Sequence, residues 1–157
     1  MLPKMRRGRA RPEMPEMQNT FEKEGVRFCY PDDWEIELEE EDGSWTASLQ
    51  GPGTAFLVVS FVPGAGDTSE LIDAAVAGLR DDYPNLEVED AVDSLAGQPA
   101  LGADIRFVHF DLTNTCWVRA VPAGEGALLV LAQCTDEELD VEGETLKKIM
   151  GTIAVDE

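Results

Sequence analysis

Two short apolar runs place the strongest constraint on how this chain can fold. Residues 55–62 read AFLVVSFV, and residues 127–132 read ALLVLA. Such runs are typical of strands buried on both faces of a sheet, because a strand with one wet face alternates apolar and polar residues. Turn-forming residues precede each run, at 51–53 and 124–126. We therefore expect a sheet in which these two runs are central strands.

Six further segments have the composition of strands separated by short turns. In residues 34–39, Trp34, Ile36 and Leu38 alternate with glutamates, which predicts one buried face and one acidic face. We expect a long strand to end at a turn formed by Thr113 and Asn114. The other strands are expected at 26–30, 45–49, 86–92, 101–112 and 115–121.

Two helices complete the pattern. Apolar residues recur at helical spacing over 69–83, after a capping Asp67 or Thr68 and before a proline that ends the helix. Thr135 and Glu138 form the capping-box pattern that starts a second helix. The expected fold class is α+β: a single-domain α/β/α sandwich, with a mainly antiparallel sheet of about six or more strands and helices on both faces.

The charge of the chain argues against nucleic-acid and membrane partners. Its 32 acidic residues outnumber 12 basic ones, for a net charge of −20. Phosphate backbones and anionic lipid surfaces repel such a protein. No apolar run approaches the ~20 residues that a membrane-spanning helix needs. The charge favours solubility, or the selection of basic partners or cations.

The first 19 residues differ in character from the rest. Residues 1–20 contain five basic and two acidic side chains, a net charge of +3, whereas the remainder has −23. No apolar stretch of a secretory signal is present in this segment, which favours a cytoplasmic location. We expect a disordered arm at 1–19, which a start at Met14 or Met17 would shorten, and one domain at 20–157.

Three cysteines, Cys29, Cys116 and Cys134, are too few and too scattered for a disulfide framework. Each has apolar or aromatic neighbours, which favours buried free thiols in a reducing compartment. Cys116 and Cys134 flank the expected hairpin at 124–126 and would lie nearly opposite each other. A disulfide between them is allowed by the pattern and is not demanded by it.

His109 is the only histidine and therefore the main candidate for catalysis. A catalytic base needs an orienting acid, and Asp104 or Asp111 would serve. Asp111 is two residues away, which predicts a shared strand face and a hydrogen bond to the imidazole. No nucleophile motif of the Gly-x-Ser-x-Gly type accompanies it. We expect a structural histidine, no catalytic residue and no enzyme activity.

The sequence also gives no metal or cofactor site. The acidic run from Glu35 to Asp42 is the candidate for weak calcium or manganese binding, but it lacks the ligand order and glycine of a calcium loop. One histidine and three dispersed cysteines do not give the spacing of a zinc site. We interpret the acidic run as a solvated strand face.

Three remaining motifs have structural interpretations. The glycines at 51–53 and 64–66 lack the lysine and helix start of a phosphate loop, so we expect turns. The acidic cluster at 136–140 is typical of a helix N-terminus. Core packing fits the tryptophans better than a ligand groove does. These residues are Trp34, Trp45 and Trp117.

Several of these segments together resemble the Mog1/PsbP-like superfamily, which includes bacterial DcrB- and PsbP-related domains. The resemblance rests on the opening strand GVRFCYPDDW at 25–34, the apolar strand at 55–62, the Tyr83-Pro84 helix end, the LAGQPA turn at 95–100 and the closing helix with Ile149. It covers nearly all of 20–156. It implies an antiparallel sheet with helices on both faces, and little chemistry.

Members of that superfamily are mostly non-catalytic binders: a Ran-associated nuclear factor, photosystem II extrinsic subunits, periplasmic lipoproteins and chaperones for type VI secretion effectors. The leading hypothesis is therefore a non-catalytic domain that binds a protein partner through a sheet face or edge, as an adaptor or secretion-related chaperone. The alternative is a small-molecule or divalent-cation module that uses the acidic strand at 35–42. An enzyme built on His109 and Asp111 ranks third.

Overall fold

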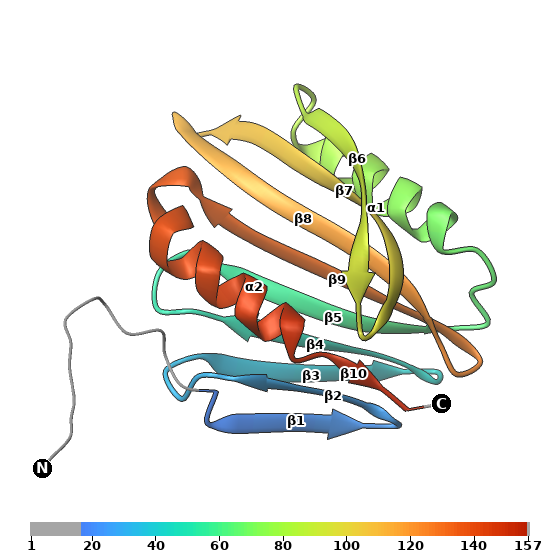
Figure 1. Ribbon diagram of the computed structural model, residues 1–157. Coiled ribbons are helices and arrows are strands. Elements are labelled where there is room, and N and C mark those ends of the chain that lie inside the picture. Colours follow the sequence, from blue (N-terminus) through green and yellow to red (C-terminus); the bar gives the residue numbers. More distant parts are fainter. Residues whose placement is uncertain (1–16, 157) are drawn as a thin grey trace, which may run out of the picture.

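The computed structural model describes residues 17–156, so most of the expected arm at 1–19, including the alternative start at Met14, lies outside the described residues (Figure 1). Asn19, placed in that arm by the sequence, already begins a strand. The strands are β1 (Asn19–Lys23), β2 (Val26–Tyr30), β3 (Glu35–Glu41), β4 (Ser44–Gln50), β5 (Phe56–Pro63), β6 (Glu87–Leu95), β7 (Gln98–His109), β8 (Leu112–Ala123), β9 (Gly126–Thr135) and β10 (Ala154–Val155). The helices are α1 (Thr68–Asp82) and α2 (Glu144–Gly151).

The strands form two sheets in which every pairing is antiparallel. The large sheet has seven strands in the order β3-β4-β5-β9-β8-β7-β6, and the small sheet has the order β1-β2-β10. The two apolar runs become β5 and β9, which pair with each other near the middle of the large sheet. This confirms an α+β fold built mainly on antiparallel sheet.

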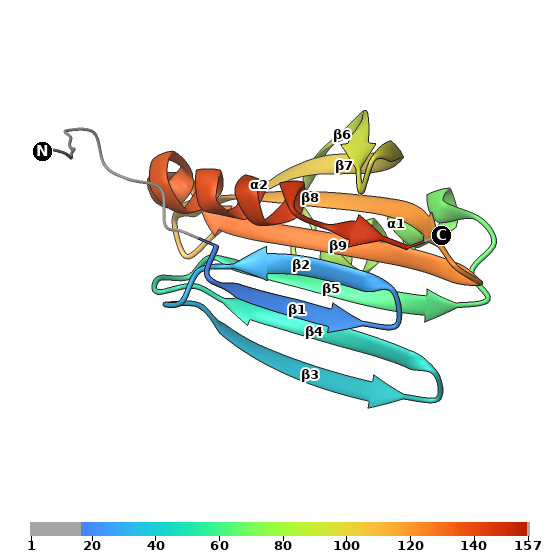
Figure 2. The same cartoon turned by 60° about the horizontal axis from the view of Figure 1, so that its bottom comes forward.

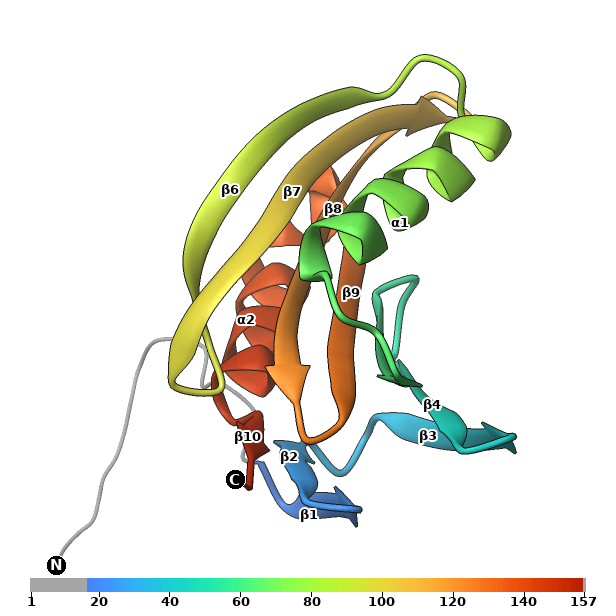
Figure 3. The ribbon, with the colours of Figure 1, turned by 90° about the vertical axis from the view of Figure 1, so that its right-hand side faces the viewer.

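Alternate residues of β8 and β9 face two separate apolar layers. Cys116 and Val118 pack with Ile72 of α1 on one face, whereas Val121 and Leu128 pack with Leu146 of α2 on the other. Figure 3 shows α1 and α2 on either side of the curved sheet. A second sheet on one face is a layer that the simple α/β/α sandwich expected from sequence does not contain. The helix α1 packs against β7, β8 and β9, and α2 shares its face with the small sheet (Figure 2).

The small sheet has a clear physical reason for its position. Phe28 of β2 is fully buried and stacks on Phe21 of β1 at 4.9 Å, and Phe21 in turn lies 5.5 Å from the ring of Trp45 on β4. The small sheet thus completes the cover over β4 and β5. Sequence patterns did not indicate β1 or β10, because their alternation is short and their residues are only half-buried.

One hairpin turn lies three residues before the position expected from the sequence. The strand β7 ends at His109, and β8 begins at Leu112, so Thr113 and Asn114 belong to β8 and do not form a turn. Phe110 and Asp111 make the turn, with φ angles of 52° and 62°. Sequence reasoning missed it because neither residue is the glycine that usually marks such a turn.

The capping residues predicted the start of α1 correctly, whereas α2 begins later than its capping box indicates. The Asp67 carboxylate accepts a hydrogen bond from the Ser69 amide at 2.9 Å and caps α1. The Thr135–Glu138 capping box is present, but the chain continues as a 3₁₀ turn and a π-helical turn before α2 begins at Glu144. No helix of the described residues combines the length and apolarity needed to cross a bilayer.

The expected possibility of a disulfide between Cys116 and Cys134 is excluded. The register places Thr115 opposite Cys134, and Gln133 opposite Cys116. A one-residue offset sends the two thiols to opposite faces of the sheet, and they lie in different apolar layers. Both cysteines are buried and free, and Cys29 is also free.

A glycine on β7 creates the space for the most buried basic side chain of the described residues. A Cβ on Gly102 would collide with the Val118 carbonyl oxygen and lie 2.5 Å from Cδ of Arg119. The Arg119 side chain crosses β7 at this point, and only 6% of the residue is exposed. A larger residue at 102 would therefore displace either the β8 backbone or the arginine.

We expect Gly102→Ala to lower the free energy of unfolding by about 2 kcal/mol, because overpacking here meets backbone rather than a flexible side-chain end. Gly78→Ala on the exposed side of α1 is the matched control. Its Cβ would meet nothing within 4 Å, so the change should raise stability by about 0.5–1 kcal/mol. Urea denaturation of both variants checks the pair. Equal effects would contradict the proposed collision.

The buried thiols predict a loss of stability at alkaline pH. Burial raises the pKa of Cys116 to about 12 and that of Cys134 to about 11, from an ordinary value of 9.0. The unfolded chain therefore releases these protons first, and folding stability falls as pH rises from 9 through the folded-state pKa values. Denaturation between pH 8 and pH 11 should show a shallower decline for Cys116→Ala/Cys134→Ala than for the native sequence. Identical slopes would be contrary to this expectation.

Candidate functional site

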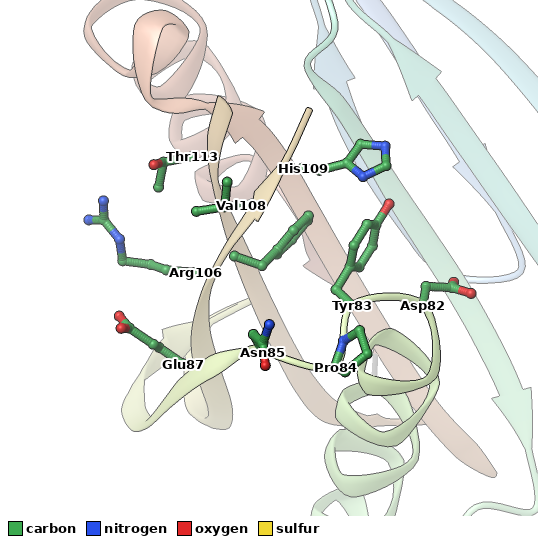
Figure 4. Close-up of a pocket in the computed structure, with 10 residues that line it drawn as sticks. Asp82, Tyr83, Pro84, Asn85, Glu87, Arg106, Val108, His109 and Thr113 are labelled. Atoms are coloured by element: carbon green, nitrogen blue, oxygen red, sulfur yellow. The ribbon is translucent and has the colours of Figure 1, made fainter. Parts of the chain in front are cut away.

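The clearest candidate site lies where α1 ends beside the last residues of β7. A cavity of about 530 Å³ opens there, and its lining comes from 82–85, from Glu87, from 106–109 and from Thr113 (Figure 4). The cavity forms because α1 stops at Asp82, before Pro84, and the chain must then travel to the start of β6. Its position therefore follows directly from the end of a helix.

Aromatic rings form one wall of this cavity. Tyr83 stacks on Phe107, with ring centroids 4.1 Å apart, and the His109 ring meets Tyr83 edge-on at 5.2 Å. Phe107 and His109 share a face of β7 because they are two residues apart. Figure 4 shows the imidazole beside the Tyr83 ring. The site thus offers a flat apolar wall with two polar tips, the phenol and the imidazole.

The structure does not assemble the catalytic pair considered from the sequence. Asp111 lies in the turn with a φ of 62° and not on the strand, so the expected shared face is absent. Asp104 is on the opposite face of β7 from His109 and contacts Arg119. Within residues 17–156, no hydrogen bond joins His109 to a carboxylate. The geometry gives His109 an aromatic environment formed by Tyr83 and Phe110.

The β7 backbone has an open edge at this cavity. Pairing between β6 and β7 begins at Glu87, opposite Arg106, so residues 107–109 pair with β8 on one side only. A strand edge presents unpaired N–H and C=O groups to any chain that approaches it. The cavity therefore lies where a further strand would continue the line of β6.

Apolar side chains cluster around that edge. Phe110 is 85% exposed at the hairpin tip, Val108 is 65% exposed, and Leu112 is also exposed. These three are among the eight large apolar side chains that are exposed in the described residues. Exposed apolar residues gathered in one region mark interaction sites more often than single ones do. We call residues 107–112 the hairpin end.

The Phe110 backbone is in a conformation that bulky residues avoid. Four hairpin turns of the described residues have a positive φ at both turn residues. In the turns at 24–25, 42–43 and 96–97 the second residue is glycine, whereas the turn at 110–111 contains no glycine. A side chain in this left-handed region costs roughly 1–2 kcal/mol. Observed strain of this kind supports a hypothesis of function, because the same turn with Asn-Gly would be more stable.

The other edges of the large sheet are protected by charge. The edge strand β3 has five glutamates in seven residues, and the other edge strand, β6, contains Glu87, Glu89, Asp90 and Asp93. Charged side chains prevent edge-to-edge association. The hairpin end has only Asp111 and His109 among its polar side chains, so it is the least protected part of these edges.

Charged groups surround the cavity without closing it. Arg106 forms an ion pair with Asp136 at 2.6 Å, and Asp136 also accepts a hydrogen bond from Thr115. Asp82 and Glu87 also line the cavity as exposed residues, and Glu87 is the cross-strand neighbour of Arg106 (Figure 4). Because Arg106 is paired with Asp136, the charges that remain at the rim are those of the acidic residues Asp82 and Glu87.

The acidic run from Glu35 to Asp42 forms β3 and the turn after it. Its side chains alternate between the faces of β3, so Ile36 points to the core and the neighbouring glutamates point away. Within 17–156, no group of three or more possible ligands converges on a common point. The strand alternation directs successive carboxylates of the run to different faces of β3.

The three tryptophans occupy different environments. Trp34 and Trp45 are buried, as expected for core residues. Trp34 packs so closely on Gly51 that a Cβ there would lie 2.8 Å from its ring. Trp117 is only partly buried and lines a second cavity beside α2. Sequence alternation did not separate this partly exposed indole from the two core residues.

The glycine motifs are loops, as expected. In the loop before β5, the Glu138 carboxylate accepts hydrogen bonds from the Thr54 amide at 2.8 Å and its hydroxyl at 2.6 Å. The same carboxylate accepts a bond from the Thr135 amide, and these bonds hold the pKa of Glu138 below its usual value despite partial burial. Glu138 thus fastens the loop at 51–54 to the helix start.

Comparisons with known proteins show the fold. No family model matches this sequence, and no curated protein is similar enough to match. Solved structures do match at low identity. A Bacteroides thetaiotaomicron protein has 14% identity and a TM-score of 0.60 over 90% of this chain, which spans only 50% of that protein.

Two other solved structures cover similar lengths on both sides. LpqN, involved in cell envelope biogenesis of Mycobacterium tuberculosis, has 14% identity and a TM-score of 0.52, over 84% of this chain and 83% of LpqN. The cyanobacterial PsbP (CyanoP) of Synechocystis sp. PCC 6803 has 12% identity and a TM-score of 0.57, over 88% of this chain and 92% of that one. The fold is therefore PsbP-like.

Relief of the strained turn gives a direct test of the site geometry. We expect Phe110→Asn to raise the free energy of unfolding by about 1 kcal/mol, because asparagine tolerates the left-handed region. Asp111→Gly should act in the same direction for the same reason. Urea denaturation measures both effects. A clear loss of stability in both variants would mean that the turn is not strained.

Proposed function

We propose that this protein is a non-catalytic binding domain that holds a protein partner at the hairpin end. One observation carries the proposal: the unpaired β7 edge at 107–109 coincides with a cavity, an aromatic wall and the strained, exposed Phe110. The exposed apolar side chains and the strained turn cost the isolated domain solubility or stability. A partner that covers them would offset that cost.

The geometry favours an extended segment of the partner. An added strand would hydrogen-bond to the β7 backbone, and side chains on one face of that strand would enter the cavity against Tyr83 and Phe107. Asp82 and Glu87 on the rim favour basic residues flanking the apolar ones. A basic, amphipathic segment therefore fits the chemistry of the hairpin end.

We further propose an adaptor or secretion-related chaperone role in a reducing, cytoplasmic setting. The three free cysteines support the reducing compartment, because neither buried thiol has a partner on its own sheet face. The DcrB-related branch of the superfamily and a sandwich with helices on both faces remain part of this proposal. The alternative is a small-molecule or divalent-cation module, and a second cavity beside α2 supports its small-molecule form.

Affinity capture with matched variants tests the binding site. We expect the domain to retain a specific partner, Phe110→Asn to reduce that retention at least about tenfold by losing a buried aromatic anchor, and Val92→Asn to leave it unchanged. Val92 is the matched control because it is an exposed apolar residue of β6, at 73%, outside the hairpin end. Because Phe110→Asn is expected to stabilise the fold, lost binding would not be attributable to unfolding. Equal losses for both variants, or none for Phe110→Asn, would contradict the proposal.

A further inference from the structure

A second cavity, of about 460 Å³, lies between the β6–β7 turn and α2. Residues 93–97 form one wall, Lys147 and Met150 of α2 form the other, and Trp117 lies between them with Arg119. The volume is within the range of small-molecule sites, roughly 300–1,000 Å³. The cavity opens on the face of the sheet that carries α2 and does not share a lining residue with the hairpin end.

The buried Arg119 is a structural group here and is not free to bind an anion. Its Nε donates to both oxygens of Asp93, at 3.0 and 3.1 Å, and its Nη1 donates to the carbonyls of Ala103 and Val118. Its Nη2 lies 2.9 Å from Oδ1 of Asp104. The hydrogen bonds and charges of Asp93 and Asp104 raise the pKa of the guanidinium against the effect of burial.

The two aspartates, in contrast, retain unused acceptor capacity. The Asp93 and Asp104 side chains are 53% and 40% exposed, so they reach the cavity from their anchored positions beside Arg119. Oδ1 of Asp104 is buried against Arg119 Nη2, so the exposed part of this carboxylate is what faces the cavity. Two carboxylates against one guanidinium leave a charge of −1 at this wall. This wall of the cavity is therefore suited to a ligand group that donates hydrogen bonds and is positively charged.

A cation of the chain itself already lies across this cavity. Nζ of Lys147 lies 5.4 Å from the centre of the Trp117 ring, which is within the range of a cation–π contact. Lys147 is exposed and forms no ion pair among those of the described residues. Its flexible stem lets the ammonium group leave the ring at little cost.

We propose that this cavity binds a small organic cation, a primary ammonium or guanidinium group on an apolar body. The cationic group is held by Asp93, Asp104 and the face of Trp117, in the position that Lys147 now occupies, and the apolar body lies against Leu95 and Met150. Lys147 is an internal competitor that a ligand displaces. This site is separate from the partner site and does not depend on it.

Titration of the full chain with hexylammonium tests the proposal, with 1-hexanol and hexanoate as the uncharged and anionic counterparts. The readouts are tryptophan fluorescence and the NMR signal of the Trp117 indole N–H. We expect hexylammonium to bind in preference to both counterparts. Lys147→Met should tighten that binding about three- to tenfold, because the competing cation is removed while its apolar stem is kept.

Lys148→Met is the matched control, since it removes the same charge from the same helix but lies outside the cavity lining. It should change binding by less than a factor of about two. Asp104→Asn should weaken hexylammonium binding. If that variant fails to fold, the comparison of Lys147→Met with Lys148→Met still decides the matter. Equal affinities in these two variants, tighter binding of hexanoate, or equal binding of 1-hexanol would overturn the proposal.

Discussion

The pairing of β9 between β5 and β8 is the constraint on which the rest of this structure depends. Val130 on β9 lies opposite Val59 on one side and Arg119 on the other, and this register assigns alternate residues of three strands to two apolar layers. One layer packs under α1, and the other packs under α2 and the small sheet. A shift of one residue would exchange the layers and expose both cores.

That register also decides the chemistry of the cysteines and of Arg119. Cys116 and Cys134 point to opposite faces and remain thiols, whereas Arg119 points to the α2 face and crosses β7 over Gly102. Arg119 holds Asp93 and Asp104 in place, although its own side chain is almost entirely buried. A buried pair of this kind is better regarded as an anchor than as a source of stability, since desolvation opposes the Coulombic gain.

Much of the fold was predictable, because it depends on periodicity. The apolar runs at β5 and β9, the capped start of α1 and the capping box at Thr135 all follow from local rules. The short strands β1 and β10 were missed because pairing, and not pattern, defines them. The hairpin turn was misplaced because Phe110 takes a glycine-like conformation.

The candidate sites were less predictable than the fold, and for a different reason. His109 was singled out as the only histidine, yet only tertiary structure brings it and Phe107 of β7 together with Tyr83, the residue that follows α1. The open edge at 107–109 exists because β6 starts opposite Arg106, which no local pattern reveals. Trp117 and Lys147 are 30 positions apart in sequence and meet across β8 and α2.

The central claim is that a partner occupies the β7 edge at the hairpin end. Hydrogen–deuterium exchange of the captured complex measures this directly, because an added strand would protect backbone amides that water now reaches. The account predicts that amides of 107–112 exchange more slowly in the complex than in the free domain, while those of β3 are unchanged. Protection confined to β3 or to the small sheet, with 107–112 unaffected, would contradict it.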